Sequence, residues 1–337
     1  MNRLPDRVPE TIRFERGRLA FLDQRKLPHE VHYWQIDSLD DAIEAIRTLA
    51  VRGAPAIGIA AAYALAMSMR DVPVERRTGV LHAHAERLKG ARPTAVNLAA
   101  AVDRLLALNT HEPELLLEEA ERLHAEDRGI CARIGQFGMP LIKAGANILT
   151  HCNAGALAVS ALGTATAPLY LAHRAGRKFH VWVDETRPLL QGARLTAWEL
   201  STAGIEVTLI CDHVPASLME AGRIDLIIVG TDRVARNGDT ANKIGTLGLA
   251  VLAHHFGIPF YVACPSTTYD PDTKDGSTIV IETRGAEEVL GTHAAKVNVY
   301  NPAFDVTPVN LITGFITDQG LITRPTESAL LRTFRRV

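Results

Sequence analysis

Thiol and carboxyl side chains stand directly after apolar runs in the second half of this 337-residue chain. Cys152 follows the run 147–150, Asp184 follows 179–183, and Asp232 comes three residues after 226–229. Two further runs lead to Cys211–Asp212 and to Cys264. Thiolates and carboxyl groups can act as nucleophiles, acids and bases. Their repeated placement after such runs favours an enzyme.

The same runs indicate how these side chains are positioned. They are short and rich in β-branched residues, which is typical of buried parallel strands. From about residue 146 they alternate with helical segments, as in βαβ units. Helices are predicted over 155–175, 191–203, 214–222, 241–256 and 307–318. Because ligands bind beyond the carboxyl ends of the strands in an open parallel sheet, the thiols and acids are expected to line that edge.

The first part of the chain has a different pattern. Residues 11–36 alternate loosely around a turn near Gly17, which predicts a small antiparallel sheet. Ser38 is a good N-cap for the first helix, and helical patterns continue over 57–69, 76–89, 95–108 and 113–137. We therefore expect an α/β protein with two domains. A mostly helical N-terminal domain would span 1–135, and a catalytic domain with a parallel sheet would span 136–337.

Composition argues against several partners. The net charge is −2 and no long basic block is present, so the sequence does not predict a surface that binds nucleic acid. The longest apolar stretch, Ala54–Met69, is shorter than the roughly 20 residues of a membrane span, so it is predicted to be a buried helix. The N-terminus lacks the apolar core of a signal peptide, and the four cysteines form no Cys-x-x-Cys pair. Free thiols in a reducing cytoplasm are therefore expected.

Cys152 is the first candidate catalytic residue. It lies at a predicted strand end, just before Gly155, which opens a helix. A helix N-terminus lowers the pKa of a thiol and favours the thiolate. His151 is its neighbour, but successive side chains on a strand point to opposite faces, so a direct dyad is not expected. The alternative is a small, inert cysteine in the core, because free cysteine is among the most buried residue types.

Asp232 is the second candidate. It begins a stretch, 232–246, that is dense in polar, small and charged residues. A solvated turn followed by a capped helix is the simpler interpretation, and the Asn-Gly pair at 237–238 fits it. That interpretation leaves Asp232, Asn242 and Lys243 around one connection unexplained. Lys243 near a helix start is predicted to bind an anion, because main-chain N–H groups point outward there.

Three further residues are candidates for ligand binding. Gln191 stands at a predicted helix start, just after the charged segment 184–188. Arg52 and Arg92 stand beside glycine and proline in the helical part of the chain. The guanidinium group holds phosphate in a forked geometry. The alternative for each arginine is a surface residue or the neighbour of a helix cap.

No metal or other cofactor is expected. The sequence lacks a Gly-x-Gly-x-x-Gly segment after a strand and lacks the phosphate-binding Gly-x-x-x-x-Gly-Lys-[Ser/Thr] loop. His254 and His255 are adjacent, so a helix points them about 100° apart. They are predicted to form the cationic end of a helix instead of a metal site.

The motifs together resemble the methylthioribose-1-phosphate isomerase family. That family belongs to a wider group that includes the regulatory subunits of a translation initiation factor's exchange factor. The likeness covers nearly the whole chain, and so many matches in order are specific for the family. The motifs are Leu22–Arg25, Arg52–Gly58, Arg92–Leu98, Thr150–Asn153, Asp184–Pro188, Gln191–Leu195, Asn242–Thr246 and Asn301–Pro308.

The resemblance implies a substrate, a fold and a role for each candidate. The substrate would be a small phosphorylated sugar, 5-methylthioribose 1-phosphate, converted to its ketose in methionine salvage. The fold would be a helical domain on a Rossmann-like domain, in a homodimer. Asp232 would be the proton donor, kept protonated by a closed, partly apolar crevice, and Cys152 the partner that stabilises or assists the transition state. Substrate-binding residues would be Arg52, Gly53, Ala54, Arg92, Gln191, Asn242 and Lys243.

Three places depart from the family pattern. Asp212 is followed by His-Val-Pro, Ala-Leu-Gly occupies 161–163, and Thr231 stands where alanine is common. These changes leave Cys152 and Asp232 intact but open the choice of the group at C5 of the sugar. Two alternatives therefore remain. The substrate could be 5-deoxyribose 1-phosphate or another pentose 1-phosphate, or the chain could be a non-catalytic, regulatory-subunit-like binding protein.

Overall fold

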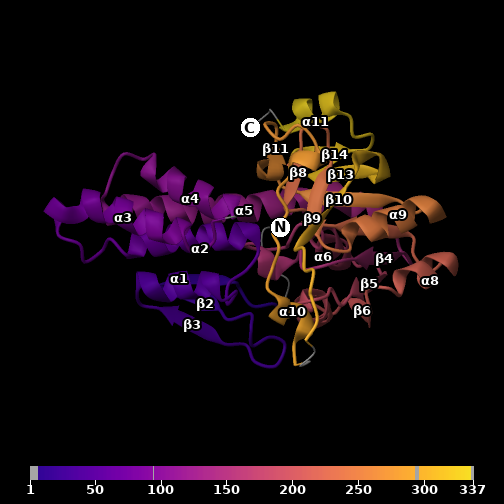
Figure 1. Cartoon of the computed structure of the whole chain (residues 1–337), viewed down its shortest axis with the longest axis horizontal. Coiled ribbons are helices and arrows are strands. Elements are labelled where there is room, and N and C mark those ends of the chain that lie inside the picture. Colours follow the sequence, from indigo (N-terminus) through magenta and orange to yellow (C-terminus); the bar gives the residue numbers. More distant parts are fainter. Residues whose placement is uncertain (1–6, 94, 293–295, 335–337) are drawn as a thin grey trace. The chain divides into compact units, whose positions relative to one another are not determined.

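The computed structural model describes residues 7–93, 95–292 and 296–334 (Figure 1). The chain divides into two compact units. The first unit comprises 1–129 together with 156–163, and the second comprises 130–155 together with 164–337. The boundary that we predicted at 135/136 falls inside the long helix α5 (Pro113–Gly138), a few residues beyond the division at 129/130.

The first unit combines a small sheet with a group of helices, as the sequence predicts. Its antiparallel sheet has the order β1-β2-β3. The strands are β1 (Ile12–Glu15), β2 (Arg18–Leu22) and β3 (Tyr33–Ile36). The helices are α1 (Leu39–Arg47), α2 (Ala54–Met67), α3 (Arg77–Lys89), α4 (Val96–Leu106) and the first part of α5, with a 3-10 turn at Val74–Arg76.

Local chemistry explains where two of these helices form. Ser38 caps α1, because its hydroxyl accepts the N–H of Asp41 while the Asp41 carboxylate accepts the N–H of Ser38. α2 is apolar on every side, and nearly all of its residues are buried. A helix of that kind is stable only among other elements, and α2 lies beside α4 and α1 in the first unit (Figure 1).

The segment 156–163 belongs to the first unit although both of its flanks belong to the second. It contains the 3-10 turn Ala156–Ala158. The carbonyl oxygen of Leu157 accepts hydrogen bonds from Thr11 Oγ1 at 3.1 Å and from Gln24 Nε2 at 2.7 Å. The main-chain N–H of Ser160 donates to Asp127 at 2.8 Å. These bonds tie the segment to the beginning of the chain and to α5.

The second unit is built on a sheet with seven strands among the described residues, in the order β14-β13-β10-β7-β4-β5-β6. All neighbouring pairs are parallel except β13 and β14. This is the Rossmann-like topology, with an added antiparallel edge strand. The strands are β4 (Asn147–Thr150), β5 (His180–Asp184), β6 (Glu206–Ile210), β7 (Leu226–Val229), β10 (Phe260–Cys264), β13 (Gly314–Thr317) and β14 (Gly320–Ile322). The five predicted strands are therefore confirmed.

Helices cover both faces of this sheet, as parallel strands require. One face buries Leu149, Ile227 and Val262 in a core that includes side chains from α8 (Pro215–Glu220), α9 (Thr246–Phe256) and α11 (Glu327–Phe334). On the other face, α6 (Ala167–Arg174) packs closely on the end of α5, where a Cβ at Gly138 would lie 2.4 Å from Pro168. The remaining helical pieces are α7 (Ala197–Thr202), α10 (Ala286–Leu290), a π-helical turn at Gly192–Thr196, and 3-10 turns at Met139–Leu141, Ser266–Thr268, Gly276–Thr278 and Val309–Leu311.

A second sheet, with four strands and the order β11-β8-β9-β12, is not anticipated by the sequence. Its strands are β8 (Arg233–Ala235), β9 (Thr240–Lys243), β11 (Tyr269–Asp270) and β12 (Phe304–Thr307). The helix predicted over 241–256 accordingly begins only at Thr246.

The helix predicted over 307–318 is wrong. That segment contains the 3-10 turn Val309–Leu311 and then β13, whose four residues are all buried. A short apolar run that is buried on both faces has no periodicity to separate strand from helix. The helix predicted over 155–175 is also too long, since α6 begins only at Ala167.

Among the described residues, none of the helices has the length and apolar character that a membrane crossing requires.

Candidate active site

The order of the strands places two candidate residues at one point of the second unit. From β4 the chain adds β5 and β6 on one side, and it then returns to add β7, β10 and β13 on the other side. Ligands bind where the strand order reverses in this way. Cys152 follows β4 and Asp232 follows β7, so both stand at this reversal. The two connections approach closely, because a Cβ at Gly230 would lie 2.6 Å from the Cβ of Ala154.

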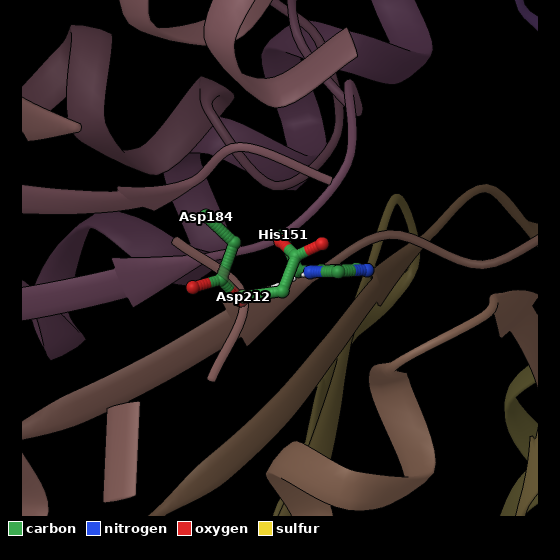
Figure 2. Close-up of side chains that lie close together, drawn as sticks. All are labelled: His151, Asp184 and Asp212. Carbon is green, nitrogen blue, oxygen red and sulfur yellow. Dashed lines mark hydrogen bonds and ion pairs between the residues drawn. The ribbon is translucent and has the colours of Figure 1, made fainter. Parts of the chain in front are cut away.

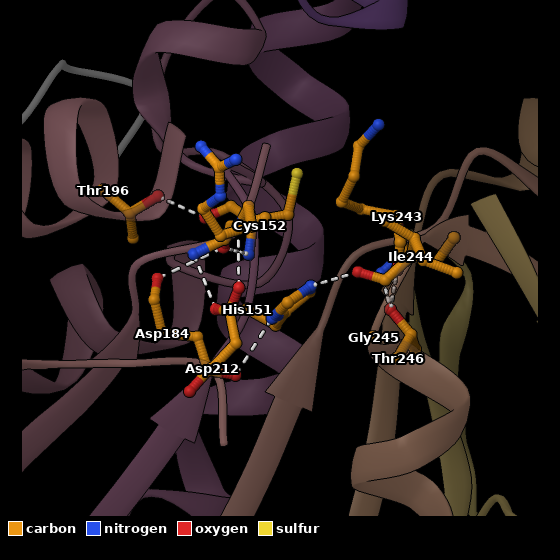
Figure 3. A network of polar contacts seen from close by, with 12 residues as sticks. His151, Cys152, Asp184, Thr196, Asp212, Lys243, Ile244, Gly245 and Thr246 are labelled. Atoms are coloured by element: carbon orange, nitrogen blue, oxygen red, sulfur yellow. Dashed lines mark hydrogen bonds and ion pairs between the residues drawn. The ribbon is translucent and has the colours of Figure 1, made fainter. Parts of the chain in front are cut away.

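Cys152 has a strained main chain. Its φ of +64° lies in the left-handed region, which side chains with a Cβ seldom occupy. Two threonine hydroxyls hold it there. Thr186 Oγ1 accepts the N–H of Cys152 at 2.9 Å, and Thr196 Oγ1 donates to the carbonyl oxygen of Cys152 at 2.6 Å (Figure 3). Strain that is maintained by surrounding bonds is typical of functional sites.

The two threonines are themselves fixed. Thr186 is fully buried and donates to the carbonyl oxygen of Asp184 at 3.1 Å. Its N–H and that of Arg187 each donate to Asp212 at 2.7 Å. Thr196 ends the π-helical turn, a conformation that is frequent at functional sites. Asp212 therefore acts on Cys152 indirectly, by holding the loop that carries Thr186.

Gln191 is a candidate ligand that contacts the thiol. Its side chain is buried, and Nε2 lies 3.5 Å from Cys152 Sγ. Its other polar atom, Oε1, is buried without a hydrogen-bond partner among the described residues. A buried, unpaired acceptor costs about 1–3 kcal/mol, so a ligand hydroxyl that donates to it would be favoured.

Asn242 and Lys243 lie in the second sheet, and Asp232 directly precedes one of its strands. Asp232 precedes β8, and its N–H donates to the carbonyl oxygen of Ala241 at 2.9 Å, while the other two residues end β9. Asn242 is buried and its Nδ2 donates to Thr246 Oγ1 at 3.0 Å. Asp232 is exposed, whereas we expected a carboxyl group buried enough to stay protonated.

The predicted anion site at a helix start needs correction. Lys243 lies on a strand, with Nζ 4.7 Å from the centre of the Phe304 ring. The main-chain N–H groups of Gly245 and Leu247, at the start of α9, donate to the Asp305 carboxylate at 2.8 and 3.1 Å. Because a carboxylate already occupies these donors, any anion bound here would depend on the Lys243 ammonium group.

His151, next to Cys152 in the chain, is hydrogen-bonded to the Asp184 carboxylate and lies near that of Asp212. Its Nδ1 lies 2.9 Å from Asp184 Oδ2, and both residues are almost completely buried (Figure 2). Burial raises the pKa of Asp184 to about 6, although the hydrogen bond with His151 opposes the shift. Burial disfavours a charged His151, but the hydrogen bond and charge of Asp184 outweigh it, so the pKa of His151 is raised.

A metal ion could use the spacing of these groups, since ligand atoms of His151, Asp184 and Asp212 lie within 4.8 Å of one another. Most of these ligand atoms nevertheless have hydrogen-bond partners, although Asp184 Oδ1 has none among the described residues. The second ring nitrogen of His151, Nε2, lies 2.9 Å from the carbonyl oxygen of Ile244. Both oxygens of Asp212 accept main-chain N–H groups. The cluster is thus built as a hydrogen-bonded network, with neither imidazole nitrogen left to coordinate a cation.

The remaining candidates lie in the first unit. Gly53, with a φ of +95°, is the N-cap of α2, and a Cβ there would lie 2.2 Å from the carbonyl oxygen of Ala158. Arg52 precedes it and Arg92 precedes α4, with both partly exposed. α2 packs closely on the start of α4, because a Cβ at Gly58 would lie 2.8 Å from the carbonyl oxygen of Asn97.

The structure thus gathers the candidates into two groups. In the second unit, Cys152, Gln191, Asp232, Asn242 and Lys243 follow neighbouring strands. In the first unit, Arg52, Gly53, Ala54 and Arg92 lie at the starts of two packed helices. Sequence reasoning missed His151, Thr186 and Thr196. The only signal for His151 and Thr186 was a position inside the motifs that carry the resemblance, and Thr196 directly follows one of those motifs.

The sequence and the structure of this chain are both similar to those of known proteins. The model of the Initiation factor 2 subunit family matches residues 50–324. A methylthioribose-1-phosphate isomerase from Gemmatimonas aurantiaca is 52% identical over 316 residues, which cover 91% of each chain. Among solved structures, 5-methylthioribose 1-phosphate isomerase from Pyrococcus horikoshii superposes with a TM-score of 0.93 at 42% identity, covering 98% of this chain and 97% of that one. Translation initiation factor eIF-2B subunit delta from A. fulgidus superposes with a TM-score of 0.87 at 39% identity, covering 97% of this chain and 100% of that one.

Proposed function

Because the chain belongs to the methylthioribose-1-phosphate isomerase family, within the larger Initiation factor 2 subunit family, we propose that it isomerises 5-methylthioribose 1-phosphate to 5-methylthioribulose 1-phosphate in methionine salvage. The observation that carries this function is the identity of 52% over 91% of both chains. The protein is thus an aldose–ketose isomerase that acts on a sugar 1-phosphate.

The substrate sets a chemical problem that the site must solve. An ordinary aldose isomerase acts on the open-chain aldehyde, but a 1-phosphate blocks the anomeric carbon, so the ring cannot open freely. In the reaction the bond between C1 and the ring oxygen breaks, and the ring oxygen gains a proton. C2 and its hydroxyl each lose a hydrogen, and C1 gains one. An acid at the ring oxygen and a group beside C1 and C2 are therefore needed.

Asp232 and Cys152 are our candidates for these two tasks. Asp232 would give its proton to the ring oxygen, and the bound sugar, by covering this exposed carboxyl group, would favour its neutral form. Cys152 would assist the transfer of hydrogen between C2 and C1. One support is that both residues follow the neighbouring strands β4 and β7, where the strand order reverses. The other is that two threonines hold the main chain of Cys152.

Substrate binding would use the other candidates. Arg52 and Arg92 in the first unit and Lys243 in the second are our candidates for binding the anionic substrate, and Gly53 and Ala54 would allow an anion to approach the start of α2 closely. Neither α2 nor α4 has a side-chain hydrogen bond at its N-cap in the described residues, so their first N–H groups suit an anion. Gln191 would use its unpaired oxygen on a sugar hydroxyl, and Asn242 would line the same region.

Turnover across a panel of C5-substituted ribose 1-phosphates tests the function. We expect the methylthio compound to be preferred. A preference for 5-deoxyribose 1-phosphate or another pentose 1-phosphate would select the alternative substrate, which the departures at 161–163 and after Asp212 leave open. No turnover of any member would select the non-catalytic alternative.

Variants test the two roles. Cys152→Ser and Asp232→Asn should each lower kcat by on the order of 100-fold or more, the usual scale for loss of a proton-transferring group. If both retained wild-type turnover, the catalytic assignment would fail. Product formed in deuterium oxide should carry deuterium at C1 if hydrogen moves as a free proton, and none if it moves as hydride.

We also propose a homodimer in the cytoplasm. The support for the cytoplasm is that Cys152, Cys211 and Cys264 are free thiols, as expected in a reducing compartment, and the dimer is implied by the family resemblance alone. Light scattering of the purified protein measures its molar mass and so tests for a dimer. A value near the 36.6 kDa of the monomer would exclude the dimer.

A further inference from the structure

His151 has no role in the proposed reaction, yet it is buried beside Cys152 and hydrogen-bonded through both ring nitrogens. It is 1% exposed and lies between the last residue of β4 and Cys152. Both of its ring nitrogens make hydrogen bonds, one toward Asp184 on β5 and one toward Ile244, just after β9. The ring therefore connects the segment of Cys152 with the segment of Lys243 (Figure 3).

The partners of the two nitrogens fix the state of the ring. The carbonyl oxygen of Ile244 only accepts, so Nε2 must carry a hydrogen and donate it. Nδ1 faces Asp184 Oδ2, and one proton lies between these two atoms, on either the ring or the carboxyl group. Asp212 and Asp305 add negative charge around the ring. The hydrogen bond to Asp184 therefore fixes the orientation of the imidazole ring. In that orientation the Nε2–H group points toward the carbonyl oxygen of Ile244.

The main chain beyond Ile244 is shaped to receive this ring. Gly245 has a φ of +108°, and a Cβ there would lie 3.0 Å from Cε1 and 3.1 Å from Nε2 of His151. The other side of this stretch is anchored by Asp305, which accepts the N–H of Gly245. Thr246 makes two hydrogen bonds within the stretch 242–246. Its hydroxyl donates to the carbonyl oxygen of Lys243 at 2.7 Å and accepts from Asn242.

We propose that His151 is a positioning residue of the isomerase: by holding the main chain at Ile244, it fixes Asn242 and Lys243 relative to Cys152. This inference rests on the function proposed above. His151 does not touch the sugar in this scheme. Its substitution therefore acts on substrate binding through Lys243, while Cys152 and Asp232 keep their chemistry.

Two substitutions separate the bonds that the ring makes. In His151→Gln the amide nitrogen reaches about as far as Nε2, so donation to Ile244 can persist. In His151→Asn the shorter amide reaches only as far as Nδ1, so the bond to Asp184 can persist while that to Ile244 is lost. We expect His151→Asn to raise KM about tenfold, the effect of one hydrogen bond, with kcat changed less than threefold. His151→Gln should raise KM less than threefold.

The matched control is His180→Gln. His180 begins β5, at the end of the strand opposite Asp184, and its Nε2 bonds Thr208 at 2.9 Å. This variant loses a histidine in the same sheet and should retain wild-type kcat and KM. Equal KM values for the Gln and Asn variants at position 151 would overturn the inference, as would a rise in KM for the His180 control.

A double-mutant cycle with Lys243→Met gives the decisive readout. If His151 acts through Lys243, His151→Asn should raise KM much less in the Lys243→Met background than in the wild type. Fully additive effects would overturn the inference. Should His151→Asn fail to fold by circular dichroism, Asp184→Asn takes its place in the cycle, because it keeps a side chain of the same size against Nδ1. Wild-type turnover is measured first, so additive effects in an active enzyme reject only the role of His151, and absent turnover rejects the proposed function itself.

Discussion

Replacing Thr196 by valine should impair turnover without removing any group that contacts the sugar. Valine keeps the β-branched shape of threonine but has no hydroxyl group. In the structure that hydroxyl donates to the carbonyl oxygen of Cys152 at 2.6 Å and accepts from Asn153 Nδ2 at 3.2 Å. Thr196 is 1% exposed, so water has little room to replace it.

The magnitude follows from these two bonds. Each contributes about 1 kcal/mol net, and a buried partner left unpaired costs about 1–3 kcal/mol, so unfolding should become easier by about 2–4 kcal/mol. The left-handed main chain of Cys152 costs about 1–2 kcal/mol, which the bonds offset. When they are lost, Cys152 can relax toward ordinary φ values and move its thiol. We expect kcat to fall about tenfold to 100-fold, equivalent to about 1.4–2.7 kcal/mol of activation free energy.

The assay compares kcat and KM for Thr196→Val and Thr196→Ser, together with urea unfolding of both. Serine keeps the hydroxyl group, so its kcat should stay within about threefold of the wild type. A valine variant that unfolds more easily but turns over at the wild-type rate would refute the reasoning. Thr196 would then stabilise the fold without positioning the thiol.

Three other predictions concern pH, packing and the thiols. Burial, with Arg128 adding to it, lowers the pKa of His124 to about 4, so its contribution to stability is full above pH ~6.5 and is lost as the pH falls toward 4, by up to about 3 kcal/mol. His124→Gln should flatten this part of a urea-unfolding series, and an unchanged slope would contradict the assignment. Gly248→Ala, an exposed position in α9 with open space around it, should raise the free energy of unfolding by about 0.5–1 kcal/mol. Gly192→Ala, whose Cβ would lie 1.8 Å from the carbonyl oxygen of Asp184, should lower it by more than about 3 kcal/mol, and similar melting curves for the two variants would refute the packing argument. In a Cys211→Ser background, iodoacetamide should modify one thiol rapidly, Cys152, in step with loss of turnover, and activity that survives full modification would contradict a role for Cys152.

The parallel strands were predictable because their apolar runs are long enough to be recognised and end in polar residues. Cys152 and Asp232 could be placed after two such runs, but not beside each other. Their placement after neighbouring strands depends on the order β4–β7 across the middle of the sheet, and no single run predicts the order of the strands. The second sheet was missed for a related reason. Its strands have only two to four residues each, too few to show a period.

His151 illustrates the limit most clearly. Alternation along a strand correctly separates it from Cys152, and it was set aside for that reason. Its importance comes from partners that lie 33 and 93 positions away in the sequence, Asp184 and Ile244. The exposure of Asp232 also differs from expectation, because burial of a side chain that follows a strand depends on elements far along the chain.

The segment 156–163 has a consequence for modularity. It completes the first unit by accepting hydrogen bonds from Thr11 and Gln24 and by donating one to Asp127, yet it is encoded within the second unit. The first unit is therefore not formed by one continuous segment of the chain. A recombination event or an engineered fusion that joined 1–129 to a new partner would leave those polar groups without their acceptor or donor. Exchange of this unit between proteins requires the transfer of two separate stretches, 1–129 and 156–163. We therefore expect these two stretches to change together in evolution.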